Sequence, residues 1–375
     1  MRFVIITHVH HIKTNQAYFG YAPYIREINI WTKYVDELVV VAPIIEKKIG
    51  AIDLSYQHPN VRFLAVPPFE TTSVKHILKT IKQLPVVVLQ TYKAMSQADH
   101  IHLRCPGNMG LIGAIVQIFF PKTKKTAKYA GNWDSKSKQP WSYRLQKWIL
   151  SNTFLTRKMQ VLVYGEWENQ SKNIKSFFTA TYSQLEIQNS EVIKQKLGFR
   201  EGIKFLFVGT LSQGKQPLYA VQLVERLIKM GLKVSLDIYG EGVLRKEIEI
   251  YIETHNLSEN IILKGNQTKE VVEKAYKTSH FLVLPSKSEG WPKVVAEAMF
   301  WGCLPIVSKI SCVPYMLAYG KRGVLLEENL ESDIFLIEQL LQDEVSYSLM
   351  TQNAQNWSRE YTLERFETEI KKLLL

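Results

Sequence analysis

The chain has 375 residues, of which 46% are hydrophobic and 22% charged, as in ordinary globular proteins. This length predicts two domains, each large enough to form its own core. The longest apolar run, residues 111–120, is too short to cross a bilayer, so any membrane contact is expected to be peripheral. The first residues are typical of a strand rather than a signal peptide. The three cysteines are odd in number and lack metal-ligand spacing, which indicates a reduced, cytoplasmic protein.

The net charge of +12 is concentrated in one window of the chain. Residues 122–158 contain ten Lys or Arg residues against a single acid, Asp134. A local basic patch of this kind predicts an anionic partner surface, and anionic lipid and nucleic acid are both candidates.

The first half of the chain shows short apolar runs between amphipathic segments. We expect strands over residues 3–7, 37–42, 62–66, 100–104 and 161–164. We expect helices over residues 111–120, 141–151 and 169–177.

The second half alternates more regularly. The predicted strands are 204–210, 233–239, 261–264, 281–285, 305–308 and 323–326, and the predicted helices are 219–230, 243–255 and 269–278. This alternation predicts a parallel, doubly wound α/β sheet, which binds ligands at the carboxyl ends of its strands. The polar stretch 188–202 separates the halves. We expect domains at 1–190 and 200–353, followed by an amphipathic helix over 354–375.

The strongest motif is LPSKSEGWPKVVAEAMFWGCLPIV, at residues 284–307. It predicts a strand, a polar loop with Glu289 and Gly290, and a helix that begins near Pro292. The N–H groups at such a helix start can bind a diphosphate or a sugar hydroxyl. Glu289 and Glu297 lie on either side of this helix start and can accept hydrogen bonds from one ligand. By spacing alone, an exposed loop acid and a helix-surface acid explain the pair equally well.

This segment resembles the Glu-x7-Glu motif of retaining glycosyltransferases of family 4, which have the GT-B fold. The Ser-x-x-Glu-Gly loop, the Glu-Ala-Met triplet and the Gly-x-x-Pro turn all match, and the resemblance covers the second half well and the first half loosely. It implies an α/β protein with two Rossmann-like domains that face each other across a cleft, the acceptor domain at 1–190 and the nucleotide-sugar donor domain at 200–353. It also implies that the helix over 354–375 crosses back to the N-terminal domain. It also implies that Glu289 binds the donor sugar and that Glu297 binds the nucleotide ribose.

The loop after Glu289 departs from the family pattern. Gly290, Trp291, Pro292 and Lys293 stand where donor contacts are expected, but the family more often has an aromatic residue, then Gly, then an apolar residue. Pro292 has no N–H to donate, so the sugar contacts of this loop differ from those of the family.

A second motif, FLFVGTLSQGKQPLYAVQLV, spans residues 205–224. A strand runs into a glycine-bearing loop and then a helix, so loop amides and Lys215 can converge on a diphosphate. The alternative is a lone surface Lys at a helix start. In the family a Gly-Arg-Leu triplet precedes the Lys. Gly209 matches that Gly, but Thr210 replaces the Arg, and Lys293 is our candidate for the missing cation.

Further candidates for the donor site are weaker. Gly240 and Gly265 follow predicted strands near the nucleotide, although each also fits a simple turn. The loop after the first strand contains Gly20 and three histidines (His8, His10 and His11) whose irregular spacing does not predict a metal site.

The strand HIHLRC supplies the remaining candidates. By resemblance, Arg104 occupies the place of a family His beside the donor sugar, with His102 two residues earlier on the same face. The exchange to Arg suggests a different sugar, one that carries a negative charge. Glu289, Lys215 and Arg104 are the residues expected to act on the reacting groups.

The basic window also contains aromatic residues at helical spacing. Trp141, Leu145, Trp148 and Ile149 form a stripe flanked by Arg144 and Lys147. This pattern suits an interfacial helix at an anionic membrane, and it equally suits a stripe that faces the core. We find no base-reading element and expect no nucleic-acid partner.

The resemblance implies transfer of a sugar, with retention, from a nucleoside diphosphate to an acceptor hydroxyl in cell-surface polysaccharide or glycolipid synthesis. The chain lacks an Asp-X-Asp sequence, so we expect no metal and no other cofactor. The expected partners are a nucleotide sugar, a glycan or lipid-linked acceptor, and an anionic membrane surface through residues 122–158. Two alternatives remain open: a GT-B sugar-nucleotide epimerase and an inactive nucleotide-sugar-binding subunit.

Overall fold

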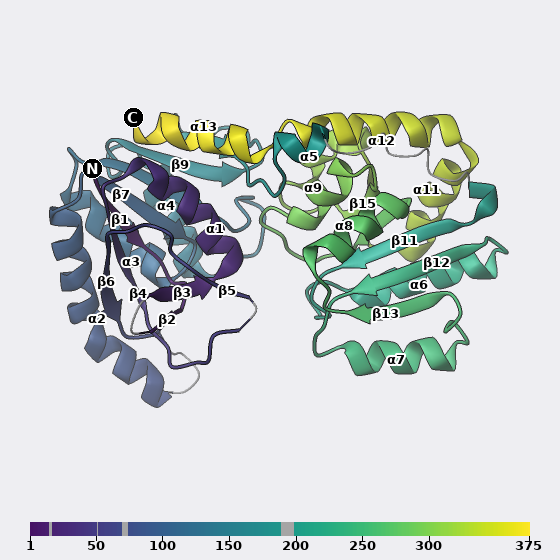
Figure 1. Ribbon diagram of the computed structural model, residues 1–375, viewed down its shortest axis with the longest axis horizontal. Helices are drawn as coiled ribbons and strands as arrows, with labels where there is room; N and C mark the ends of the chain where they lie inside the picture. The colour runs from purple at the N-terminus through teal and green to yellow at the C-terminus, as the bar shows by residue number, and fades with distance from the viewer. Residues whose placement is uncertain (15–16, 51, 70–73, 189–198) are drawn as a thin grey trace. The chain divides into compact units, whose positions relative to one another are not determined.

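The computed structural model describes residues 1–14, 17–50, 52–69, 74–188 and 199–375. The chain divides into two compact units, which are described separately (Figure 1). Unit 1 comprises Met1–Phe177 and Glu367–Leu375, and unit 2 comprises Phe178–Phe366. Most of the polar stretch expected to separate two domains, residues 189–198, lies outside the described residues.

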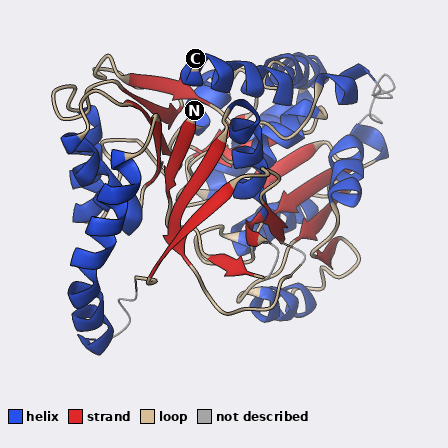
Figure 2. Ribbon diagram, turned by 60° about the vertical axis from the view of Figure 1, so that its left-hand side comes forward, coloured by secondary structure: helices blue, strands red, loops and turns tan. Residues whose placement is uncertain are grey.

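Unit 1 is built on a parallel sheet of seven described strands in the order β10-β9-β8-β7-β1-β4-β6. Figure 2 shows these strands side by side in red. The strands are β1 (Arg2–Ile6), β4 (Glu37–Pro43), β6 (Val61–Val66), β7 (His100–Cys105), β8 (Lys124–Tyr129), β9 (Met159–Tyr164) and β10 (Ile174–Phe177).

Helices cover both faces of this sheet. On one face, Trp31 of α1 (Ala22–Trp31) packs against Phe3 and His102. On the other face, α3 (Asn108–Val116) is so close that a Cβ on its Gly113 would lie 2.7 Å from Leu103. Helix α3 also contacts α2 (Val74–Ser96) and α4 (Trp141–Ser151).

A small antiparallel sheet joins unit 1 near the start of the chain. It contains β2 (His11–Lys13), β3 (Tyr18–Tyr21) and β5 (Asp53–Ser55). Gly20, expected in a loop, is a buried residue of β3 opposite His11. A Cβ at Gly20 would lie 3.1 Å from Ile25 and 3.2 Å from the His11 ring, so the glycine permits close packing at this position.

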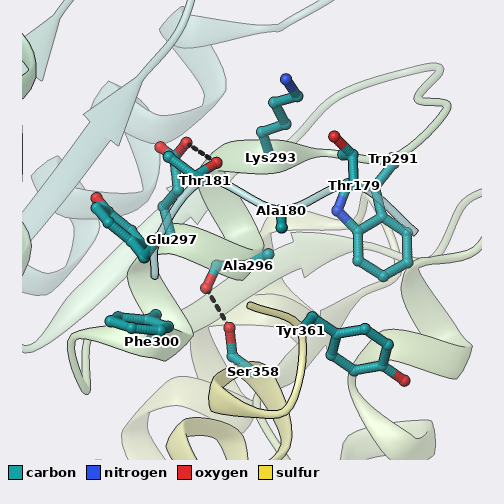
Figure 3. A pocket seen from close by; sticks show the side chains of 11 residues that line it. Thr179, Ala180, Thr181, Trp291, Lys293, Ala296, Glu297, Phe300, Ser358 and Tyr361 are labelled. Carbon is teal, nitrogen blue, oxygen red and sulfur yellow. Dashed lines mark hydrogen bonds between the residues drawn. The ribbon is translucent and has the colours of Figure 1, made fainter. Parts of the chain in front are cut away.

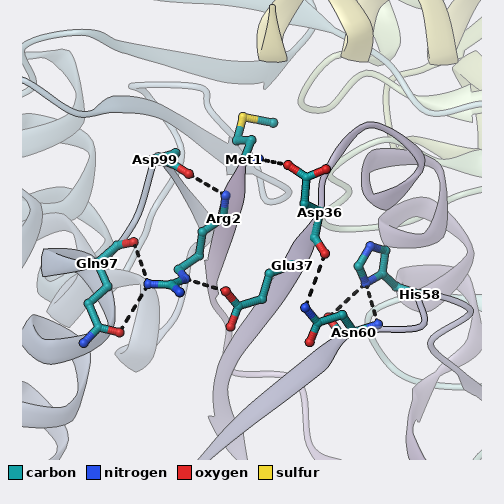
Figure 4. Close-up of polar contacts among 8 residues, drawn as sticks. All are labelled: Met1, Arg2, Asp36, Glu37, His58, Asn60, Gln97 and Asp99. Carbon is teal, nitrogen blue, oxygen red and sulfur yellow. Dashed lines mark hydrogen bonds and ion pairs between the residues drawn. The ribbon is translucent and has the colours of Figure 1, made fainter.

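Polar contacts hold together the amino-terminal ends of β1, β4 and β7 (Figure 4). Arg2 Nε lies 2.5 Å from Glu37 Oε2, and the backbone N–H of Arg2 donates to Asp99 Oδ2 at 2.6 Å. The N-terminal ammonium of Met1 pairs with Asp36. These contacts leave the opposite, carboxyl-terminal edge of the sheet available for ligands.

Unit 2 contains a parallel sheet of six described strands in the order β13-β12-β11-β14-β15-β16. The strands are β11 (Ile203–Val208), β12 (Val234–Tyr239), β13 (Ile261–Gly265), β14 (Phe281–Leu284), β15 (Leu304–Ser308) and β16 (Val324–Leu326). The helices are α5 (Gln184–Gln188), α6 (Pro217–Lys229), α7 (Arg245–Thr254), α8 (Lys269–Thr278), α9 (Lys293–Phe300), α10 (Val313–Met316), α11 (Leu330–Gln342) and α12 (Glu344–Arg359).

The predicted parallel α/β architecture is confirmed in both units, with two local errors. The helix expected over 169–177 is wrong, because Ile174–Phe177 is strand β10. The helix expected over 354–375 is interrupted: α12 ends at Arg359, and α13 (Leu363–Leu374) follows. The last residues join unit 1, where Glu367 accepts a hydrogen bond from Tyr34 at 2.7 Å.

Part of the basic window belongs to the core of unit 1. Lys125 and Lys128 lie in β8 and are buried, as is Trp133. Lys122, Lys124, Arg144, Arg157 and Lys158 remain exposed. Within the described residues, no helix is both long and apolar enough to cross a bilayer. All three cysteines are buried as free thiols.

Candidate active site

The strand order of unit 2 places two predicted motifs next to each other. From β11 the chain continues to β12 and β13 on one side, and then returns to β14 and β15 on the other. The loops 209–216 and 285–292 therefore leave adjacent strand ends in opposite directions. Parallel sheets bind ligands at such a switch point.

Lys215 and Glu289 meet at this switch point. The Lys215 ammonium forms an ion pair with Glu289 Oε1, and the two side chains are 29% and 8% exposed. The N–H of Lys287 donates to Gly214 O at 2.9 Å, and the side-chain amide of Gln216 donates to Pro285 O at 2.7 Å. The two loops are thus fixed to each other, and they hold one cation and one carboxylate in contact.

The loop after Glu289 leads into α9 as predicted. Pro292 is the N-cap residue and Lys293 the first helical residue. Trp291 is buried, with its ring centroid 6.1 Å from that of Trp357. Gly290 O accepts a hydrogen bond from Cys312 Sγ at 3.0 Å. Trp291 therefore anchors the loop, while the half-buried Lys293 lines a pocket beside it.

Glu297 reaches the same pocket from the second turn of α9 (Figure 3). Thr181 Oγ1 donates to Glu297 Oε1 at 2.9 Å, and Tyr276 OH donates to Oε2 at 3.4 Å. Burial raises the pKa of Glu297, and the hydrogen bond from Thr181 opposes that shift. Two hydroxyl groups of the protein therefore donate hydrogen bonds to the carboxylate that the resemblance assigns to ribose hydroxyls.

The predicted glycines of unit 2 bring backbone segments together behind these loops. A Cβ at Gly240, where φ is +143°, would lie 1.9 Å from Gly209 O. The N–H of Gly240 donates to Gly265 O at 2.9 Å. Gly209 and Gly240 thus follow β11 and β12, Gly265 ends β13, and the three residues touch through their backbones. Thr210 is exposed beside them and supplies no cation.

In unit 1 the structure corrects the role of His102. Its side chain is 0% exposed and hydrogen-bonds through Nδ1 to Thr126 Oγ1 at 2.8 Å. Its ring packs 4.7 Å from that of Trp31. A side chain sealed beneath α1 cannot contact a donor, so His102 is a core residue.

Arg104, two residues later, lies at the carboxyl end of β7 and is 17% exposed. Its Nη1 is 3.6 Å from Glu27 Oε1, and its guanidinium stands 5.6 Å from the centre of the Tyr24 ring. Burial, followed by the charge of Arg104, lowers the pKa of His8, which comes from the loop after β1. Arg104 therefore reaches the edge where ligands bind, whereas His102 does not.

Three residues at these sites were not predicted from the sequence. Gln216 adopts a left-handed φ of 48° and ties the two unit 2 loops together. Lys287 ties the two loops together through its backbone N–H, which donates to Gly214 O, and its position two residues before Glu289 could have suggested it. Thr181 gave no sequence signal, because its link to Glu297 spans 116 residues.

Comparison with known proteins finds a family match within unit 2. Residues 189–357 match the family model described as glycosyl transferases group 1. An uncharacterised glycosyltransferase of Methanocaldococcus jannaschii is 26% identical over 186 residues, covering 49% of this chain and 50% of that protein. The Escherichia coli UDP-Gal:alpha-D-GlcNAc-diphosphoundecaprenol alpha-1,3-galactosyltransferase is 30% identical over 174 residues, covering 45% of this chain and 44% of the relative. The chain spans about half the length of these curated relatives.

The whole chain also resembles a solved structure. The crystal structure of Anabaena HepE in complex with UDP and glucose superposes with a TM-score of 0.68 at 14% identity, covering 100% of this chain and 99% of HepE. The predicted GT-B fold is thereby confirmed. In sequence, residues 189–357 resemble the group 1 glycosyl transferases.

Proposed function

We propose that this protein is a retaining glycosyltransferase that moves a sugar from a nucleoside diphosphate to an acceptor hydroxyl. The observation that carries the proposal is the contact between Lys215 and Glu289 at the switch point of unit 2. A cation for a diphosphate and a carboxylate for a sugar are the two groups that such a donor requires, and they lie within the segment that matches the family.

The ion pair suggests how the donor enters. A diphosphate replaces Glu289 as the partner of Lys215, because it carries more negative charge than one carboxylate. Glu289 is then free to accept hydrogen bonds from sugar hydroxyls. As the bond to the sugar breaks, charge grows on the leaving diphosphate, and Lys215 together with the N–H groups at the start of α9 stabilises it.

Glu297 supports the nucleotide end of the donor. Ribose hydroxyls are chemically equivalent to the hydroxyls of Thr181 and Tyr276 that contact its carboxylate in this structure. The ribose hydroxyls thus replace the hydroxyls of Thr181 and Tyr276, and the buried carboxylate accepts hydrogen bonds both with and without the nucleotide.

Substitution of Glu289 tests the proposal. Glu289→Gln keeps the size of the side chain but removes its charge, and we expect sugar transfer to fall by about 100-fold or more with folding unchanged. Glu247→Gln, at an exposed position of α7, is the matched control and should retain full activity. Near-normal transfer by Glu289→Gln would refute the proposal.

The same assay separates the two alternatives. An epimerase converts the donor sugar without any acceptor, whereas an inactive binding subunit binds the nucleotide and releases no product. Thr210 in place of a family Arg removes one cation and is the observation that favours the inactive subunit.

For the acceptor, we infer a growing cell-surface glycan on a lipid carrier. The Escherichia coli relative, by its name, acts on a sugar linked to diphosphoundecaprenol. Unit 1 has a surface suited to that setting, formed by exposed apolar side chains of α2, α3, α4 and the adjoining loops: Val86, Leu89, Tyr92, Ile115, Phe119, Trp141, Trp148 and Phe154. Exposed cations accompany them: Lys93, Lys122, Lys124, Arg144, Arg157 and Lys158. We call these residues the helical surface of unit 1.

The helical surface differs from the window proposed from sequence. In α4, Trp141 and Trp148 are exposed, whereas Ile149 packs in the core. The ring centroid of Tyr92 in α2 lies 5.0 Å from that of Phe120, with the rings tilted, so α2 extends the surface beyond residues 122–158. A surface that carries both exposed apolar side chains and lysine or arginine residues favours the headgroup region of an anionic bilayer.

Vesicle binding tests the membrane contact. We expect the protein to sediment with phosphatidylglycerol-containing vesicles and to bind them less well at 0.5 M salt. It should not sediment with vesicles of phosphatidylcholine alone. The double variant Trp148→Ser, Phe119→Ser should lose most of the binding. Val243→Ser, at an exposed apolar position of unit 2, is the control. Equal sedimentation of the double variant would exclude this surface.

A further inference from the structure

Unit 1 contains a pocket of about 370 Å³ between the last turns of α2 and the sheet. Residues of β1, β4, the edge strand β6 and the end of α2 line it. The apolar part of the lining consists of Val39, Leu64 and Ala94. Ala94 has a small side chain, which leaves room between the helix and the strands. The volume is in the range of small-molecule sites.

The register of the sheet brings two arginines to this pocket. Arg62 of β6 pairs with Val39 of β4, which pairs with Val4 of β1. Arg2 lies two residues before Val4 and therefore on the same face of the sheet. Lys93 of α2 completes a set of three cations, and the described residues that line the pocket include no acid.

The three cations differ in the partners that they already have. Arg2 Nε lies 2.5 Å from Glu37 Oε2, and its Nη1 lies 3.5 Å from Gln97 Oε1 (Figure 4). Arg62 and Lys93 are exposed and form no ion pair with any described residue. Glu37 therefore neutralises Arg2, whereas the other two cations remain available for an anion from outside the chain.

Two further acids lie at this end of the sheet, and both already have partners. Asp36 pairs with the N-terminal ammonium of Met1, and Asp99 Oδ2 accepts a hydrogen bond from the N–H of Arg2 at 2.6 Å. Neither acid lines the pocket. They therefore do not take the place of an anionic ligand at Arg62.

The pocket also includes a polar group that lacks a partner. Gln90 lies one turn before Lys93 on α2 and lines the pocket. Its Oε1 is buried and has no hydrogen-bond partner among the described residues. A buried acceptor of this kind is uncommon in folded proteins, and a hydroxyl group of a ligand would supply the missing donor.

We propose that this pocket binds a phosphate ester that carries hydroxyl groups, such as a glycerol phosphate, with Arg62 and Lys93 as the charged ligands of the phosphate. The planar guanidinium of Arg62 presents paired N–H donors for two phosphate oxygens, and Lys93 adds a point charge. Gln90 accepts a hydrogen bond from a hydroxyl group, and the apolar side chains contact the carbon skeleton.

This inference goes beyond the proposed glycosyl transfer and does not rest on it. The pocket lies at the amino-terminal end of the strands of unit 1, whereas parallel sheets bind catalytic ligands at the carboxyl ends. The same chemistry occurs in a soluble ester and in the headgroup of phosphatidylglycerol, so the ligand has two sources that experiments must separate.

Ligand-dependent stabilisation of the full chain tests the pocket. sn-Glycerol 3-phosphate is the probe, glycerol is the neutral control, and ionic strength is held constant with chloride. Arg62→Gln, Gln90→Glu and the control Arg26→Gln, at an exposed position of α1, each lower the net charge by one unit. Any contact of the probe with Lys215 in unit 2 is common to all of these proteins. We expect Tm to rise by a few degrees for wild type and Arg26→Gln, and by less than half as much for the two pocket variants.

The Tm without the probe shows whether the variants remain folded. Arg62→Gln should melt at the wild-type temperature, because it removes an exposed side chain that has no ionic partner among the described residues. If Arg62→Gln and Gln90→Glu respond to the probe as Arg26→Gln does, the proposal is wrong. It is also wrong if the probe raises the Tm of wild type no more than glycerol does.

Vesicle sedimentation separates the two sources of the phosphate ester. If the ligand is a lipid headgroup, Arg62→Gln should bind phosphatidylglycerol vesicles less well than Arg26→Gln, and sn-glycerol 3-phosphate should compete with the vesicles for wild type. If the ligand is a soluble ester, the two variants should sediment equally while their Tm responses still differ.

These outcomes are distinct from those of the earlier proposals. The double variant Trp148→Ser, Phe119→Ser should keep the Tm response to the probe, because neither side chain lines the pocket. Loss of the pocket proposal would leave the glycosyltransferase proposal intact. Near-normal transfer by Glu289→Gln would refute the glycosyltransferase proposal while leaving the pocket proposal standing.

Discussion

Glu297 places its carboxylate in a pocket lined largely by apolar and aromatic side chains, and this burial raises its pKa. The hydroxyls of Thr181 and Tyr276 offset part of that cost. The sequence predicted a carboxylate near a ribose but not its protein partners, which lie far away along the chain. A ligand-binding group kept in a destabilising environment is a common feature of active sites.

This environment makes the stability of the protein depend on pH at Glu297. Because its folded-state pKa lies above the unfolded value, the folded protein binds the proton more tightly, and stability is lost as pH rises through the folded pKa. Glu297→Gln removes the charge. We expect the variant to resist urea better than wild type at pH 8 and to match it below about pH 4. If Glu297→Gln raises the urea midpoint equally at both pH values, the buried charge is not the cause.

Gly240 is a residue whose replacement should affect the fold itself. Gly240→Ala places a methyl group against Gly209 O and imposes a strained φ, so we expect a loss of about 3 kcal/mol or more in the free energy of unfolding. Gly214→Ala is the matched control, because a Cβ there meets no atom within 4 Å. Chemical denaturation measures the stability of both variants. Similar midpoints for Gly240→Ala and Gly214→Ala would show that the loop after β11 can move aside.

At the scale of elements, β7 shows what a local pattern leaves out. Its alternation predicted a strand, but His100 and His102 point into a buried polar row beneath α1, where both contact Thr126. Burial lowers the pKa of each histidine to about 3. Both are therefore neutral in the folded protein across the physiological range.

This row predicts acid sensitivity of unit 1. Below pH 6.5 each histidine binds a proton in the unfolded chain but stays neutral in the folded protein. The free energy of unfolding therefore falls as pH drops from 6.5 toward 3, by about 1.4 kcal/mol per pH unit for each histidine. We expect His102→Gln to flatten the dependence of urea midpoints on pH between 6.5 and 4. His255→Gln, an exposed control in unit 2, should not alter it.

The lysine-rich strand β8 marks the limit of prediction from sequence. Regular alternation predicted all six strands of unit 2 and most strands of unit 1, because apolar runs report burial locally. β8 lies within the window that the sequence predicts as a basic patch for an anionic partner. Lys128 is buried because Glu27, 101 residues earlier, pairs with it, and Lys125 donates to Phe120 O at 2.5 Å. Such distant partners leave no local signature.

The candidate site was predictable to a similar degree. The motifs predicted Lys215 and Glu289 as donor-site residues from local loop composition and spacing, and the structure places the two side chains in contact. The motifs failed for His102, because a strand face can be covered by a helix that the pattern does not reveal.

At the scale of the whole molecule, nucleotide binding is the measurement that links fold to function. We expect thermal stabilisation by one nucleoside diphosphate in preference to others, about 2.7 kcal/mol at a hundredfold excess over Kd. Glu297→Ala should abolish this stabilisation, because the carboxylate that contacts the ribose is lost. A panel of nucleoside diphosphates and nucleotide sugars provides the test, and the absence of any shift would favour the inactive-subunit alternative.

The buried thiols have a practical consequence. Burial raises the pKa values of Cys105 and Cys312 to about 12, and Cys303 is fully enclosed, so none should react with maleimide at neutral pH. Fluorophores can therefore be attached to cysteines introduced at exposed positions, such as Thr153→Cys in unit 1 and Glu247→Cys in unit 2, without removing the native ones. Energy transfer between such dyes would report, in solution, how far apart the units stand before and after a sugar donor arrives.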